Sequence, residues 1–101
     1  MKNIKIPSKF RYNGHTVSVR IVSPEVWSHG EDNVGCLDPS NMTIELRADH
    51  CPSVLRQKFL HEVVHLMLLP INRDIAEDEV FVEQLSQAMN QLGMRVEEAQ
   101  R

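Results

Sequence analysis

Two histidines and a glutamate stand together in an otherwise apolar stretch. Residues 59–69 read FLHEVVHLMLL, and His61, Glu62 and His65 are the only polar residues among them. In a helix, a spacing of four residues places both imidazoles on one face, about 5–6 Å apart at Cβ. That arrangement suits one tetrahedral zinc ion. Burying three such groups without partners would be costly, so we interpret them as a Zn²⁺ site rather than as core residues.

The glutamate next to the first histidine suggests what the metal would do. Glu62 is positioned to act on a zinc-bound water rather than to bind the ion itself. Zinc can bring the pKa of such a water to about 7, and a neighbouring carboxylate can take its proton as general base. We therefore expect His61 and His65 to be metal ligands and Glu62 to be the catalytic residue.

The third protein ligand has to come from elsewhere in the chain. A catalytic zinc ion usually has three protein ligands, and no histidine follows His65. We predict a carboxylate from the C-terminal helix, with Glu83 first because hydrophobic residues flank it. Glu79, one turn earlier on the same face, is the second choice. The other carboxylates nearby are Asp74, Glu77 and Asp78.

The first half of the chain is predicted to form a small antiparallel sheet. Asn13-Gly14 is the strongest short signal for a hairpin, since both turn residues need positive φ. Residues 38–41 are typical of a second turn. The predicted strands are residues 10–12, 15–22, 34–37 and 42–46.

Two helices are predicted to follow the strands. Pro52 fits the first turn of the motif helix and Pro70 ends it, while Gly93 suits the end of the final helix. We therefore expect one α+β domain, with the sheet packed on the motif helix and on the second, C-terminal helix. Its parts over residues 1–101 are a β-rich region (1–48), the motif helix (about 52–69), a connector (71–74), the ligand helix (about 76–92) and a tail (94–101).

Composition excludes several classes of partner. The chain has 101 residues, a net charge of −3 and scattered Lys and Arg, which argues against nucleic-acid binding. The longest apolar run, residues 66–71, is too short to span a membrane, and the N-terminus lacks the apolar core of a signal peptide. We expect a cytoplasmic protein in which Cys36 and Cys51 are free thiols.

The run from residue 42 to 92 resembles the small gluzincin-type zinc metallopeptidases. It is especially similar to the minimal forms called minigluzincins and to short metallopeptidase-like proteins of phages and mobile elements. The resemblance is carried by residues 42–46, 60–65 and 82–86. It implies a zincin-like fold, hydrolysis of a peptide or protein substrate, and a glutamate ligand that Glu83 matches best. It also implies that strand 42–46 is a sheet edge that pairs with extended peptide.

One departure from this family leaves other interpretations open. Many zinc peptidases add a Tyr or His that stabilises the oxyanion, and neither residue type occurs after His65. A non-catalytic, zinc-stabilised binding module is therefore one alternative. A helical interaction protein without metal is another. A third hypothesis, about regulation, is that tail 94–101 folds over the cleft.

Overall fold

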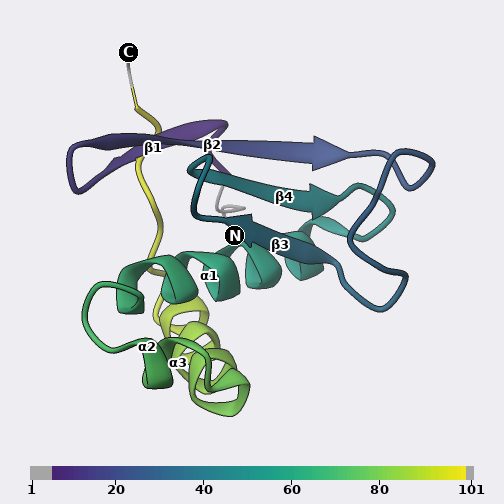
Figure 1. The fold of residues 1–101 in the computed structure, drawn as a ribbon. Coiled ribbons are helices and arrows are strands. Elements are labelled where there is room, and N and C mark those ends of the chain that lie inside the picture. Colours follow the sequence, from purple (N-terminus) through teal and green to yellow (C-terminus); the bar gives the residue numbers. More distant parts are fainter. Residues whose placement is uncertain (1–5, 100–101) are drawn as a thin grey trace.

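The computed structural model describes residues 6–99 and has an α+β fold, as predicted. Residues 1–5 of the predicted β-rich region and residues 100–101 of the predicted tail lie outside this range. The sheet forms one layer, α1 lies against it, and α2 and α3 pack against α1 away from the sheet (Figure 1). The elements are β1 (Lys9–Tyr12), β2 (His15–Val22), β3 (Gly35–Asp38), β4 (Thr43–Arg47), α1 (Pro52–Leu68), α2 (Arg73–Ala76) and α3 (Glu79–Gln91).

The sheet is mixed, with strand order β1-β2-β4-β3. Both predicted hairpins are present, and Asn13 and Gly14 have the positive φ angles of 53° and 82° that their turn requires. The prediction of a wholly antiparallel sheet is wrong, because β2 and β4 pair in parallel. Parallel strands need a connection of about a dozen residues or more, and residues 23–42, including β3, provide it.

The position of β4 corrects a second expectation. Strand 42–46 was expected to be a sheet edge, but β4 lies between β2 and β3. Ile44 and Leu46 on β4 are fully buried, as expected for a strand in the interior of the sheet. The edge beside the motif helix is the shorter β3 instead.

Helix α1 is buried on opposite sides, as its apolar composition predicts. Towards the sheet, Phe59 packs edge-on against Phe10, with ring centroids 6.0 Å apart. Val64 on α1 and Val82 on α3 are also fully buried, and the two helices pack against each other. The main core cluster comprises Phe10, Val17, Val19, Ile44, Leu46, Leu55, Phe59, Leu60, Val63 and Leu66.

The predicted C-terminal helix is divided into two. Asn72 caps α2, which occupies the segment expected to be a connector and the start of the helix. Asp78 then caps α3 by accepting a hydrogen bond from the Phe81 N–H at 3.1 Å. These local caps compete with a continuous helix. As a result, Glu79 is the first residue of α3 rather than an interior one.

Polar side chains fix the position of α3 along α1. The Gln57 amide donates to Ser86 Oγ at 3.0 Å, and its oxygen accepts from the Asn90 amide at 3.0 Å. Arg56 donates to the Asn90 oxygen, also at 3.0 Å. Such directional contacts specify one register between two helices that apolar packing alone would define less sharply.

The C-terminal segment runs from α3 back to β1, the edge of the sheet opposite β3 (Figure 1). The Ala99 N–H donates to the Lys9 carbonyl at 2.9 Å, and the Glu98 carboxylate accepts from the Ser8 N–H at 2.8 Å. Val96 packs against the core. The hypothesis that the tail covers the cleft is therefore wrong for residues 94–99, which run from the end of α3 to β1.

Two further expectations concern membranes and thiols. Among residues 6–99, no helix combines the length and the apolar character needed to cross a bilayer. Cys36 and Cys51 are free thiols, Cys36 partly buried on β3 and Cys51 exposed just before α1.

Candidate metal centre

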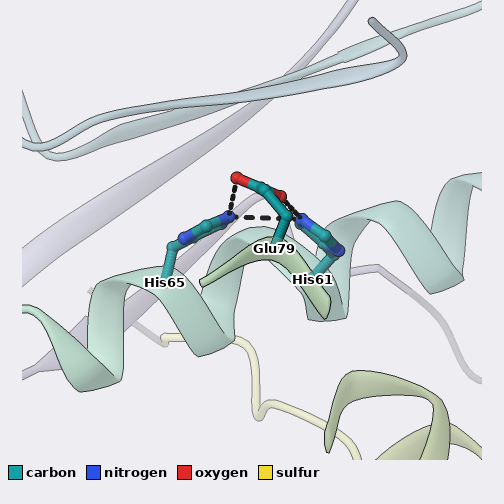
Figure 2. Close-up of side chains that lie close together, drawn as sticks. All are labelled: His61, His65 and Glu79. Atoms are coloured by element: carbon teal, nitrogen blue, oxygen red, sulfur yellow. Dashed lines mark hydrogen bonds and ion pairs between the residues drawn. The ribbon is translucent and has the colours of Figure 1, made fainter. Parts of the chain in front are cut away.

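His61 and His65 project side by side from one face of α1 (Figure 2). Their ring centroids are 4.9 Å apart, and their Nε2 atoms are only 3.2 Å apart. Both side chains are mostly buried, with exposures of 12% and 16%. The predicted pair of ligands is thus brought together, with the same ring nitrogen of each imidazole facing one point.

Glu79 supplies the carboxylate at that point (Figure 2). Its Oε1 lies 3.0 Å from His61 Nε2, and its Oε2 lies 3.3 Å from His65 Nε2. Asp78 is the N-cap of α3, so Glu79 is the first residue of the helix, and its side chain reaches both histidines of α1. Glu79, the second choice from the sequence, is therefore the carboxylate that converges with the two histidines.

Glu83, the first choice, lies on the other side of the same imidazole. Its Oε1 is 2.7 Å from His61 Nδ1, and its Oε2 accepts from Gln87 at 3.0 Å. Partial burial alone would raise the pKa of Glu83, but the hydrogen bond from His61 and the charge of Lys58 hold it below its ordinary value. Glu83 is thus an ionised acceptor that orients His61, and the geometry does not place it among the converging ligand atoms.

The Nδ1 contacts determine which ring nitrogens carry protons. His65 Nδ1 lies 2.6 Å from the Ala76 carbonyl, which can only accept, so this nitrogen must donate. The Glu83 carboxylate likewise requires His61 Nδ1 to donate. In the neutral imidazoles, both Nε2 lone pairs then face each other and the Glu79 carboxylate. Three electron-rich groups this close need a cation between them, either a metal ion or an added proton.

The distances fit a metal ion. Ligand atoms bonded to zinc at about 2.0–2.1 Å in a tetrahedron lie about 3.3 Å from one another. The two Nε2 atoms lie 3.2 Å apart, and His61 Nε2 and His65 Nε2 lie 3.0 Å and 3.3 Å from the Oε1 and Oε2 atoms of Glu79 respectively. With one ligand atom taken from each residue, the three atoms lie within 4.8 Å of one another. Histidine ligands in proteins usually donate their other ring nitrogen to a carboxylate or a backbone carbonyl, as both do here. The donor set of two imidazoles and one carboxylate therefore suits Zn²⁺ with a fourth position open.

Glu62 lies beside the two histidines in an unusual environment for a carboxylate. Its side chain is 8% exposed and forms no hydrogen bond with another residue in the described range 6–99. Burial raises the pKa of Glu62 above its ordinary value, although His61 and His65 oppose the rise. A carboxylate with a pKa shifted towards neutrality can both take and release a proton.

A cavity of about 520 Å³ opens over these groups. Helix α1 forms one side, with Glu62 and both histidines, and the edge strand β3 forms the other. A Cβ atom on Gly35 would lie 3.3 Å from both Cγ and Oε2 of Glu62. The glycine thus allows the sheet edge to approach the Glu62 carboxylate closely, a role that no pattern in the sequence indicates.

No tyrosine and no further histidine lines this cavity in the described chain. Tyr12 points its hydroxyl to the Met67 carbonyl, and His29 pairs with Glu45 on the far side of β4 from Ile44. His50 contacts Arg47, and His15 lies at the start of β2. The missing oxyanion partner noted in the sequence is therefore not supplied by the N-terminal half.

Comparison with protein-family models, with curated proteins and with solved structures gives no significant match to this chain. The resemblance to gluzincins thus depends on residues 42–46, 60–65 and 82–86 alone, and the case for function depends on the geometry of the site.

Proposed function

We propose that this protein is a zinc-dependent peptide hydrolase. The observation that carries the proposal is the convergence of His61 Nε2, His65 Nε2 and the Glu79 carboxylate beside the buried Glu62. A structural zinc site has four protein ligands, whereas three ligands and an open position are typical of catalysis. The proposal therefore keeps zinc and the predicted histidines but takes Glu79, not Glu83, as the third ligand.

The chain's own residues have distinct parts in such a reaction. Zinc, when held by His61, His65 and Glu79, would polarise a scissile carbonyl and acidify a water molecule. Glu62 takes a proton from the attacking water and delivers it to the leaving amine. Glu83 and the Ala76 carbonyl hold the two imidazoles in the tautomer that directs Nε2 towards the ion.

The substrate is proposed to be a peptide bound in extended form along β3. The Arg47 N–H donates to the Val34 carbonyl at 2.8 Å, which fixes the hydrogen-bonding phase of the β3–β4 ladder. Bonded and non-bonded pairs alternate along an antiparallel ladder, so Gly35 and Leu37 direct their N–H and C=O groups away from β4. Addition of a peptide strand to such an edge is a common recognition mode.

The substitution Glu62→Gln tests the proposed activity. It should leave one zinc per chain and the fold intact, while peptide hydrolysis falls by at least about a hundredfold, as expected for loss of a general base. A His65→Ala variant, which should lose both zinc and hydrolysis, is the matched control. Full hydrolysis by a folded, zinc-loaded Glu62→Gln protein would contradict the assignment of Glu62.

A second candidate function is a non-catalytic, zinc-stabilised module that binds an extended protein segment. The cavity lining favours it, since no Tyr or third His from the described residues borders the cavity. Zinc at full occupancy with no cleavage across a broad peptide library would support this module. We propose a cytoplasmic location for either function, in keeping with the free thiols of Cys36 and Cys51.

A further inference from the structure

The cavity is lined by a lysine, Lys58, whose ammonium has no acidic partner at close range within the described chain. Lys58 is half-buried and lines the cavity with His61 and Glu62. Its ammonium forms no hydrogen bond and no close ion pair with the residues in the range 6–99, although its charge lowers the pKa of both Glu62 and Glu83 from a distance. Confining a lysine without a close partner costs side-chain entropy and some solvation.

The position of Lys58 relates it directly to the metal centre. It precedes His61 by three residues and Glu62 by four, which places all three on one face of α1. The rise of about 1.5 Å per residue puts its Cα about 4.5 Å from that of His61 along the helix axis. Because helical side chains lean towards the N-terminus, the ammonium lies on the N-terminal side of the metal centre.

At the opposite end of the cavity, the basic residue already has an acidic partner. Leu69 and Arg73 line it beyond His65, and the Arg73 guanidinium already faces Glu77 at 3.8 Å. The floor from Lys58 to Leu69 spans eleven residues of α1, or about 16 Å. An extended peptide advances about 3.3 Å per residue, so about five substrate residues fit above this floor. Figure 1 shows β3 lying along α1 on the other side.

We propose that Lys58 binds a carboxylate of the substrate, two or three residues from the bond that is cleaved. This inference depends on the proposed function and specifies its substrate class as peptides with an acidic group on the Lys58 side of the metal. The carboxylate is either an Asp or Glu side chain or the C-terminus of the peptide. Both provide the same oxygen pair for a charge-assisted hydrogen bond.

The experiment compares matched peptides on the zinc-loaded protein. Peptides carrying Glu, Gln or Lys at each of three positions on both sides of the cleaved bond are assayed for kcat/KM, each with a free and an amidated C-terminus. Glu should exceed Gln by about tenfold at one position, as expected for a charge-assisted contact. A free C-terminus that outperforms the amide, with no side-chain effect, assigns the contact to the terminal carboxylate.

Variants at the two ends of the cavity separate a direct contact with Lys58 from a general effect of positive charge in the cavity. Lys58→Gln should abolish the preference for the acidic peptide over the Gln peptide, whatever its effect on the rate with the Gln peptide itself, and Lys58→Glu should favour the Lys peptide. Arg73→Gln removes the same charge from the other end and should leave the preference intact. Equal loss for acidic and neutral peptides in Lys58→Gln, or equal effects of both variants, would overturn the proposal.

Binding distinguishes failure of this inference from failure of the proposed function. The same peptides are titrated against zinc-loaded Glu62→Gln protein, which needs no turnover. Tighter binding of the acidic peptide, lost in the Lys58→Gln background, supports the inference even if no peptide is ever cleaved. Equal affinity for Glu and Gln peptides on a protein that does bind them would overturn it, and so would the absence of binding by any peptide.

Discussion

The two edge strands of the sheet, β1 and β3, differ in whether another segment of the chain covers them. At the β1 edge, the outward carbonyl of Lys9 accepts from Ala99 at 2.9 Å, and its N–H lies 3.3 Å from the Glu98 carboxylate. At the β3 edge, the outward groups of Gly35 and Leu37 border the cavity above the candidate metal centre. Unpaired strand edges promote aggregation and are usually covered.

This difference separates a structural edge from a candidate functional one. The chain uses its own C-terminal segment to bond the outward N–H and C=O groups of Lys9 on β1. The same segment was a candidate to cover the cleft. It leaves β3 open where Gly35 meets Glu62. The contacts of Val96, Glu98 and Ala99 indicate that this segment stabilises the fold, and the open β3 edge supports our proposal that a peptide binds there.

Chelation should have the largest effect, because the proposed zinc ligands join α1 to α3. A site filled at about a thousand times its dissociation constant contributes about 4 kcal/mol, so removing zinc should lower Tm by more than about 10 °C in a domain of this size. Hydrogen exchange should rise in α2 and in the first turn of α3, which carry Ala76 and Glu79. A Tm that does not respond to chelator would favour the helical protein without metal.

Alteration of the open edge itself should have an intermediate effect. In Gly35→Ala, the new methyl group would contact Glu62 and the Leu46 side chain at 3.3 Å, so the carboxylate must shift by a few tenths of an ångström. We expect kcat to fall about tenfold, since small misplacements of catalytic groups are costly. Zinc content should not change. Cys36→Ala, at the neighbouring position, is the control and should retain activity.

Removal of the tail should have the smallest effect on activity. Deleting residues 95–101 exposes the β1 edge and removes the Val96 contact, so the free energy of unfolding should drop by about 1–3 kcal/mol, typical of a few lost hydrogen bonds and one apolar contact. Hydrolysis by the folded fraction should not rise. A marked increase in activity after deletion would restore the idea that the tail blocks the site.

The features that local sequence determines were predictable. The hairpin at Asn13-Gly14, the limits of α1 and the pairing of His61 with His65 follow from turn chemistry, proline positions and helical spacing. The parallel pairing of β2 with β4 was not, because it depends on which apolar faces meet across about twenty intervening residues. Long-range strand order leaves no local pattern in a single sequence.

The sequence alone does not distinguish Glu79 from Glu83 as the third metal ligand. Both lie on the face of α3 that meets α1, so periodicity selects them equally. Their assignment depends on where α3 sits along α1, which Gln57, Ser86 and Asn90 fix through side-chain contacts. It also depends on the cap at Asp78, which interrupts the helix that we predicted from about residue 76. The Ala76 carbonyl is a backbone group and carried no sequence signal at all.

Zinc affinity of Glu79→Gln and Glu83→Gln, measured side by side with the original protein, tests the central claim most directly. The geometry predicts that Glu79→Gln loses a ligand and no longer retains zinc against a competing chelator. Glu83→Gln should keep one zinc per chain, with an affinity reduced by about ten- to a hundredfold, as for other groups that orient a histidine ligand. Retention of tight zinc binding by Glu79→Gln together with its loss in Glu83→Gln would contradict this account of the metal centre.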